Sequence, residues 1–526
     1  MLAAGCGKVR LRADAASAPT PADGADAASV DGGDAVAPDD VAPAGPDAAA
    51  ERPPGLDAAA DVQPPAPPAY AGTITGGVVR EGGIYEVVTA PDGSWYEAGI
   101  FTRPTDFDPG PRDATVAPLG ASDVFVSAFA ADGQYRWTRV LRDSADDTTV
   151  RVAIKPGGGV AVYGSYREMV EFFPGDAASR KTAAAGTTEG YILRLDADGS
   201  GGTLRVFPSA TMAAVYHVVA VDDGLVAVGQ FKGSIDLGAG PRRMGQSGGF
   251  AIKLDVNGNA AWGRTYLAPP GAATATTTLS TAADAALGSV WLAGAFAGSV
   301  QVDATAPLAA AVPGQALFAV KLDFQGEVVA RAHLDFGSET VVPLASRMAS
   351  DGSLYLGGAF QGGALPAAAG RPAQPAAGVQ DGFLIKLGAD GSYQWGRAYG
   401  GPETDLVNAL AALPAPDQGV AAGGQFSSPT LDLDPGGAGD RRERTRGTAF
   451  VVRLAADGSY RGGITLGSAD LNNTLECQSL LGIPGGLLLA GAFRGTVDFD
   501  PREPQKDERP SVGFTAAYVS RYTLAP

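Results

Sequence analysis

Short apolar runs, separated by turns that contain glycine, recur along residues 70–526 and predict β-strands rather than helices. In six of these runs an aromatic residue comes first, and a glycine follows eight positions later. Most of these glycines belong to Asp-Gly or Asn-Gly pairs, which are typical of tight hairpins. The aromatic/glycine pairs are Phe125/Gly133, Tyr191/Gly199, Phe250/Gly258, Phe318/Gly326, Phe383/Gly391 and Phe450/Gly458.

A seventh run has no such turn. It begins at Tyr518, and its glycine would stand at position 526, which is Pro526. The last unit therefore lacks its fourth strand. Residues 70–76 read like residues 460–466, which form the fourth predicted strand of the sixth unit. We expect residues 70–76 to supply the missing strand and to close a ring.

A second sequence mark, Gly-x-aromatic, stands at the end of an apolar run in every unit. Successive glycines are 64–67 residues apart, and such a fixed period is typical of repeat architectures. The seven glycines are Gly99, Gly164, Gly229, Gly294, Gly358, Gly424 and Gly491.

Each unit predicts four short strands, and the first two are apolar at successive positions. That pattern indicates sheets buried on both faces. Seven such sheets can stack radially, whereas a solenoid would need capping units that the sequence does not show. We therefore predict an all-β fold: a seven-bladed β-propeller with four-stranded blades, closed by the N-terminal strand.

The repeated strands resemble those of a known bacterial family. Phe383-Leu-Ile-Lys-Leu387 before an Asp-Gly turn, and Leu225-Val-Ala-Val-Gly-Gln-Phe231, are similar to the seven-bladed propeller repeat often called the SBBP repeat. The resemblance covers residues 70–526. It implies a secreted or surface propeller, and it implies no shared catalytic motif.

The N-terminal part has a different character. Leu2-Ala3-Ala4-Gly5-Cys6 resembles a bacterial lipoprotein processing site, although the same letters could arise by chance in an Ala/Gly-rich chain. The resemblance implies that residues 1–6 are the remnant of a signal with Cys6 as the lipidation site, and Gly7 implies outer-membrane sorting. Residues 7–69 are mainly Ala, Pro, Asp and Gly, so we predict a disordered tether.

Charge and cysteine content exclude some classes of function and of covalent link. The net charge is −18, which argues against nucleic-acid binding and suits a self-repelling monomer. The two cysteines, Cys6 and Cys477, stand in unrelated settings, so we expect no disulfide. No run of eighteen apolar residues is present, so a lipid on Cys6 is the expected membrane attachment.

Three long loops begin with Asp-x-Asp-Pro. Two carboxylates at positions i and i+2 of an extended segment point the same way and could bind Ca²⁺. The same aspartates could instead accept backbone hydrogen bonds in a turn whose bend is fixed by the proline. We favour this second interpretation. We expect no cofactor, with calcium as the one candidate. The aspartate pairs are Asp106/Asp108, Asp432/Asp434 and Asp498/Asp500.

Acidic residues also follow the fourth strands, where they would fall near the mouth of the channel. A glycosidase uses a pair of carboxylates, but no spacing singles out a pair here. The two histidines, His217 and His333, fall in unrelated repeat positions, so we assign no catalytic residue. The candidate ligand-binding rim consists of Asp147, Glu339, Asp405 and Asp470.

Two further residue types recur in the repeat. A Lys or Arg occupies the fourth position of the third strand in six units, and we expect its head to lie in water over a blade edge. Tryptophan occurs on three fourth strands, and we expect these rings to cover blade surfaces. The cations are Arg194, Lys253, Lys321, Lys386, Arg453 and Arg521, and the tryptophans are Trp137, Trp262 and Trp395.

These features together predict a non-enzymatic lipoprotein of the outer membrane, either periplasmic or surface-exposed. The propeller would bind a protein or glycan ligand through its long-loop face, because function tends to reside on elaborated loops. The alternative is an extracellular glycan hydrolase or lyase that uses carboxylates at the channel mouth.

Overall fold

The computed structural model describes residues 68–524, with short gaps. Residues 7–67 of the predicted tether and the lipidation site Cys6 lie outside the described residues, and Ala69, which the prediction placed in the tether, belongs to the first strand. Within the described part, no helix is long and apolar enough to cross a membrane. The gaps are residues 76–81, 109, 144–147, 156–157, 222–223, 239–240, 268–278, 285–286, 311–313, 369, 414–418, 445–447, 469, 471 and 503–504.

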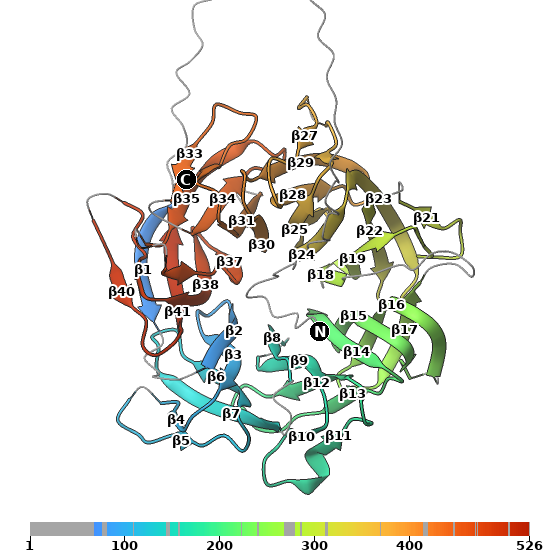
Figure 1. Cartoon of the computed structure of the whole chain (residues 1–526), viewed down its shortest axis with the longest axis vertical. Helices are drawn as coiled ribbons and strands as arrows, with labels where there is room; N and C mark the ends of the chain where they lie inside the picture. The colour runs from blue at the N-terminus through green and yellow to red at the C-terminus, as the bar shows by residue number, and fades with distance from the viewer. Residues whose placement is uncertain are drawn as a thin grey trace, which may run out of the picture. The chain divides into compact units, whose positions relative to one another are not determined.

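Seven four-stranded antiparallel sheets surround one axis as the blades of a propeller, which confirms the predicted fold (Figure 1). From the axis outward, blade 1 contains β2 (Gly82–Thr89), β3 (Trp95–Phe101), β6 (Asp123–Phe129) and β7 (Tyr135–Asp143). Blade 2 contains β8 (Arg151–Ile154), β9 (Val160–Tyr166), β12 (Glu189–Leu195) and β13 (Leu204–Phe207). Blade 3 contains β14 (Met212–Val221), β15 (Gly224–Asp236), β16 (Pro241–Asp255) and β17 (Ala260–Tyr266).

The remaining blades follow the same order. Blade 4 contains β18 (Leu279–Asp284), β19 (Ser289–Ala297), β22 (Gln315–Asp323) and β23 (Val328–Ser338). Blade 5 contains β24 (Thr340–Met348), β25 (Leu354–Gln361), β28 (Asp381–Leu387) and β29 (Tyr393–Tyr399). Blade 6 contains β30 (Asp405–Ala412), β31 (Val420–Phe426), β34 (Ala449–Leu454) and β35 (Tyr460–Leu466).

Blade 7 joins the two ends of the ring. Its inner strands come from the C-terminal part, and its outer strand comes from the N-terminal part, as the repeat predicts. The Thr73 and Ser520 hydroxyls share a buried hydrogen bond of 2.8 Å across this joint. The strands are β37 (Ser479–Ile483), β38 (Gly486–Arg494), β41 (Ala516–Thr523) and β1 (Ala69–Thr75), with β36 (Thr474–Leu475) beside β38.

The two recurring features of the repeat, the glycine of Gly-x-aromatic and the aromatic residue that opens the third strand, are cross-strand partners. In every blade the glycine of Gly-x-aromatic pairs directly with the aromatic residue that opens the third strand. In blade 3, a Cβ on Gly229 would collide with the carbonyl oxygen of Ala214 and with the ring of Phe250. The glycine is required because an inner-strand carbonyl and an aromatic ring occupy the space of its side chain.

The recurring cation and the tryptophan connect neighbouring blades. Lys253 Nζ and Trp262 Nε1 of blade 3 both donate to the carbonyl oxygen of Phe324, in the hairpin turn of blade 4, at 3.2 and 3.1 Å. Lys386 and Trp395 of blade 5 make the same pair of bonds to blade 6, with distances of 3.1 and 3.0 Å.

The expectation that the cation heads lie in water is therefore wrong for most of them. Arg194, Lys253 and Lys386 are all less than 9% exposed, and each donates to a turn carbonyl of the next blade. A buried charge needs such a hydrogen bond to offset its lost hydration. Arg521, on the third strand of the closing blade, is exposed.

The loops between the second and third strands are not irregular. In six blades each loop folds as a small hairpin, and in blade 3 the strands β15 and β16 simply extend. Figure 1 shows the hairpins at the outside of the ring. They are β4 (Thr105–Asp106) with β5 (Thr115–Val116), β10 (Met169–Glu171) with β11 (Arg180–Thr182), β20 (Ser299–Val300) with β21 (Leu308–Ala309), β26 (Ala364–Leu365) with β27 (Gln374–Pro375), β32 (Thr430–Asp432) with β33 (Arg441–Glu443), and β39 (Thr496–Asp498) with β40 (Glu508–Pro510).

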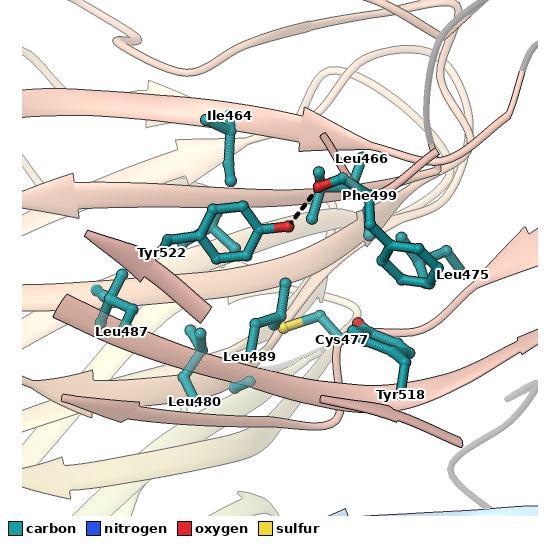
Figure 2. Close-up of a cluster of buried hydrophobic side chains, with 14 of the residues drawn as sticks. Ile464, Leu466, Leu475, Cys477, Leu480, Leu487, Leu489, Phe499, Tyr518 and Tyr522 are labelled. Carbon is teal, nitrogen blue, oxygen red and sulfur yellow. Dashed lines mark hydrogen bonds between the residues drawn. The ribbon is translucent and has the colours of Figure 1, made fainter. Parts of the chain in front are cut away.

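The core lies between adjacent blades, and one of its buried clusters joins blades 6 and 7 (Figure 2). Cys477 is fully buried there among leucine and tyrosine side chains, and burial raises the pKa of its thiol. Tyr522 donates from its hydroxyl to the carbonyl of Phe499 at 2.9 Å. The thiol therefore has the buried setting of a structural rather than a reactive cysteine.

Removing β1 should open the ring. A chain that begins at residue 78 leaves the edge of β41 unpaired and the Ser520 hydroxyl without Thr73, whereas a chain that begins at residue 66 keeps both. We expect the shorter chain to melt roughly 5–10 °C lower, because several kcal/mol of strand pairing and packing are lost. Calorimetry on both chains measures the difference, and equal melting temperatures would contradict the closure.

Candidate functional site

The Asp-x-Asp segments begin the loop hairpins of blades 6, 7 and 1, which are consecutive in the closed ring. The residue between the two aspartates is a core residue in each case. Phe107, Leu433 and Phe499 are all completely buried. Alternation along the strand therefore turns both aspartates away from the core and toward their own loop.

The first aspartate of each pair ties the two arms of its hairpin together. In blade 6, Asp432 Oδ1 accepts the backbone N–H groups of Asp434 at 2.9 Å and of Asp440 at 2.8 Å. In blade 7, Asp498 Oδ1 accepts those of Asp500 at 3.0 Å and Asp507 at 2.9 Å. The matching bonds in blade 1 run from Asp108 and Ala114 to Asp106 Oδ1.

The second aspartate of each pair is also bonded within its loop. Asp108 accepts from the Gly110 N–H at 2.8 Å, and Asp434 accepts from the Ala438 N–H at 3.1 Å. Asp500 holds Arg502 through both Nε and Nη2 at 2.8 Å, and this hydrogen bonding lowers the pKa of the carboxyl. The part of the chain that the structure describes holds no group of three or more His, Cys, Asp or Glu residues arranged to bind a metal.

The four candidate rim acids do not form one cluster. Asp147 lies outside the described residues. Glu339 and Asp470 are exposed on different blade junctions, and each carboxylate accepts a hydrogen bond from a nearby side chain or backbone group. Asp405 is fully buried. The described members of the rim are therefore dispersed.

Asp405 belongs to a buried carboxyl pair at the junction of blades 5 and 6. Its carboxylate accepts four hydrogen bonds, among them one of 2.6 Å from the Ser428 hydroxyl. Burial raises its pKa against these bonds. Burial, aided by the charge of Asp405, also raises the pKa of the neighbouring Asp381 to about 6. Asp381 Oδ1 has no hydrogen-bond partner among the described residues.

A groove of ≈1150 Å³ lies between the loop hairpins of blades 6 and 7. It brings together three of the residues proposed from the sequence: Asp470, Asp498 and Asp500. Hydroxyl, amide, carboxylate and cationic groups line it, and no aromatic ring does. The other lining residues are Arg441, Arg442, Glu443, Thr465, Gly467, Ser468, Asn473, Thr496, Pro501, Lys506 and Glu508.

Sequence reasoning missed a group of polar side chains on the innermost strands. Glu86, Arg151, His217 and Arg347 interrupt strands that are otherwise apolar, and that interruption is the signal that could have found them. Glu86 Oε2 accepts the Val152 N–H from blade 2 at 2.8 Å. Their repeat positions look unrelated along the chain, yet the closed ring directs all four blades toward one axis.

The hydrogen bonds of the Asp-x-Asp segments lead to a prediction about calcium. Because these carboxylates already accept bonds from their own loops, we expect no stabilisation when about 10 mM CaCl₂, which exceeds the dissociation constants of weak extracellular sites, replaces EDTA. Thermal melts of the wild type measure this. A shift of several degrees that Asp106→Ala, Asp432→Ala and Asp498→Ala abolish would instead show that the pairs bind calcium.

The buried pair predicts a specific pH dependence. Since the folded-state pKa of Asp381 is raised to about 6, its neutral form favours folding below about pH 4, and that contribution is lost as pH rises through 6. Asp381→Asn should match the wild type near pH 4 and become more stable by roughly 1–3 kcal/mol at pH 8. Urea unfolding across this range measures the difference.

Asp390→Asn is the control, because the pKa of that exposed turn aspartate is lowered by Ser392. An offset for Asp381→Asn that does not change with pH would contradict the prediction.

Comparisons with known proteins place the chain in no family. No family model matches it, and no curated protein matches it. Among solved structures, an ulvan lyase of polysaccharide lyase family PL25 has a TM-score of 0.41 at 9% identity, covering 86% of this chain and 96% of that one. An ACO/RPE65 chimera has a TM-score of 0.31 at 10% identity, covering 75% and 93%. The extracellular domain of a putative hybrid two-component system from B. thetaiotaomicron has a TM-score of 0.18 at 10% identity, covering 81% and 70%. Similarities this low carry no argument about the activity of this chain.

Proposed function

We propose that the protein is a non-catalytic binding scaffold and that it holds a glycan in the groove between blades 6 and 7. The observation that carries this proposal is the composition of the groove. Exposed Arg441 and Glu443 face it from one hairpin, and Asp470 and Asn473 face it from the next blade junction. Such a mixture of donors and acceptors of both charges suits the hydroxyl groups of a sugar better than it suits an apolar ligand.

The carboxylates near the groove support binding rather than hydrolysis. A glycosidase needs two carboxyl groups that both reach the scissile bond. Asp498 and Asp500 instead hold the backbone and Arg502 of their own loop. The pair with shifted pKa, Asp381 and Asp405, is 1% and 0% exposed.

The scaffold would be a surface or periplasmic lipoprotein of the outer membrane, which its N-terminal segment tethers through Cys6. The resemblance of its repeats to SBBP-type propellers supports this location, because that family is found in secreted and surface proteins. A tether of more than sixty residues would present the groove to ligands away from the membrane.

The groove should bind a glycan in a way that depends on its own side chains. We expect the full chain to select hits on a glycan array, and we expect Arg441→Ala and Asp470→Ala each to weaken those hits roughly 5–30-fold, the value of one or two polar contacts. Calorimetric titration measures the affinities, and Asp390→Ala, an exposed turn residue of blade 5, is the matched control.

Three outcomes would overturn the glycan proposal. An array without hits, together with a protein ligand captured through Arg441, would assign the groove to protein binding. Hits that neither groove variant weakens would place the glycan elsewhere. New reducing ends or unsaturated sugars, formed when a hit is incubated with the protein, would show the hydrolase or lyase alternative.

Lipidation at Cys6 has a direct test because the chain contains only one other cysteine. When the full-length protein is expressed in a bacterium with two membranes, we expect labelled palmitate to be incorporated and to be lost in Cys6→Ser. Cys477→Ala should keep the label, because that thiol is buried in the core. Label that persists in Cys6→Ser, or none in the wild type, would remove the lipoprotein proposal.

A further inference from the structure

The inner strands carry a group of charged side chains that the proposed glycan groove does not use. Figure 1 shows β2, β8, β14 and β24 around the axis of the ring. Glu86, Arg151, His217 and Arg347 lie on these four strands, and each is partly buried. They come from blades 1, 2, 3 and 5, and three of the four are basic residue types.

Arg347 interacts electrostatically with residues of two other blades. Its charge acts on His217 of blade 3, and its own pKa responds to Tyr163 of blade 2. Blade 4 separates blade 5 from blade 3 along the ring, but the innermost strands β24 and β14 both border the axis. Arg347 and His217 therefore face a common space near the axis.

Arg347 has no anionic partner within the described part of the chain. Its guanidinium makes one hydrogen bond there, from Nη1 to the carbonyl of Ser346 at 3.3 Å, and it forms no ion pair. A guanidinium offers five N–H donors, and removing it from water without a partner is costly. Burial accordingly lowers the pKa of Arg347. The unused donors are the feature that an added anion would satisfy.

The pKa of His217 reflects the positive charge of the nearby arginines. Burial, and then the charges of Arg347 and Arg151, lower the pKa of its imidazole to about 3. No carboxylate is among the groups that act on it, although the chain as a whole carries a net charge of −18. Its Nδ1 atom is buried and has no hydrogen-bond partner among the described residues.

The nearby carboxylate and the strand geometry fit this arrangement. Glu86 accepts the Val152 N–H at the junction of blades 1 and 2, and its charge acts on Arg151. A bulge between Val215 and His217 inserts Tyr216 into β14, and bulges re-aim side chains. Glu86 thus offsets charge on the side of Arg151 and leaves Arg347 uncompensated.

We propose that Arg347, Arg151 and His217 form a binding site for an anionic group, a carboxylate, sulfate or phosphate, at the axis of the propeller. Arg347 and Arg151 would donate charge-assisted hydrogen bonds, which are stronger than neutral ones. His217 would add one N–H donor from its neutral ring. The site is separate from the groove between blades 6 and 7, so each can fail without the other.

Titration calorimetry on the full chain tests the site with three probes: inorganic sulfate, a uronic-acid tetrasaccharide and a neutral glucan tetrasaccharide. We expect both anions to bind and the neutral sugar not to bind at this site. Arg347→Gln should weaken anion binding roughly 10–100-fold, which corresponds to the loss of a charge-assisted hydrogen bond. Arg461→Gln is the matched control, because Arg461 is exposed on the outer strand of blade 6.

Further variants distinguish a loss of anion binding at this site from a loss of folding and from an effect on the groove between blades 6 and 7. Arg347→Lys keeps the charge but loses the two-pronged geometry, so it should bind more weakly than the wild type even if Arg347→Gln unfolds. Arg441→Ala should leave anion binding unchanged. Tighter binding of the acidic tetrasaccharide than of sulfate would identify an acidic glycan as the carrier, and the reverse would identify a free ion. No binding of either anion, or binding that all Arg347 variants retain, would overturn the proposal.

Discussion

The close approach of an aromatic ring to a glycine on the next strand is the contact on which each blade depends. The glycine leaves room both for that ring and for an inner-strand carbonyl, as at Gly229 with Phe250 and Ala214. A larger residue would push the first and third strands away from the second. The glycine pairs with the aromatic residue in all seven blades, and the ring also lies against the glycine at Gly358 and Gly424, so the pairing accounts for the period of the sequence.

Contacts between blades complete the ring. A lysine and a tryptophan from one blade donate to a single turn carbonyl of the next, as Lys386 and Trp395 do at Ala456. These bonds place charged heads inside the joint, where a carbonyl replaces water. The same joints carry the apolar cores, so blade order and blade spacing are fixed together. The N-terminal strand β1 then supplies the one sheet edge that the last blade lacks.

The side chains that remain available for ligand binding are those that take no part in these folding contacts. Acidic residues of the long loops are used to fold the hairpins, since Asp432 and Asp498 each accept two backbone N–H groups. Side chains that the hairpins do not use, such as Arg441 and Glu443, face the groove between blades 6 and 7. At the axis, Arg347 retains donors that no described residue occupies. These two places are therefore the ones that we propose as ligand sites.

The sequence by itself determined the number of blades, the four-stranded pattern and the closing strand. Those features repeat, and hairpin glycines such as Gly391, with φ near +87°, are recognisable because few other residues adopt that conformation. Only the tertiary structure decided which side chains meet. The carbonyl that Lys253 binds is on another blade, the charge of Arg347 acts on His217 two blades away, and the hairpin role of Asp498 depends on a backbone N–H nine residues later. Cross-blade distances depend on how the ring closes, and no local pattern along the chain encodes them.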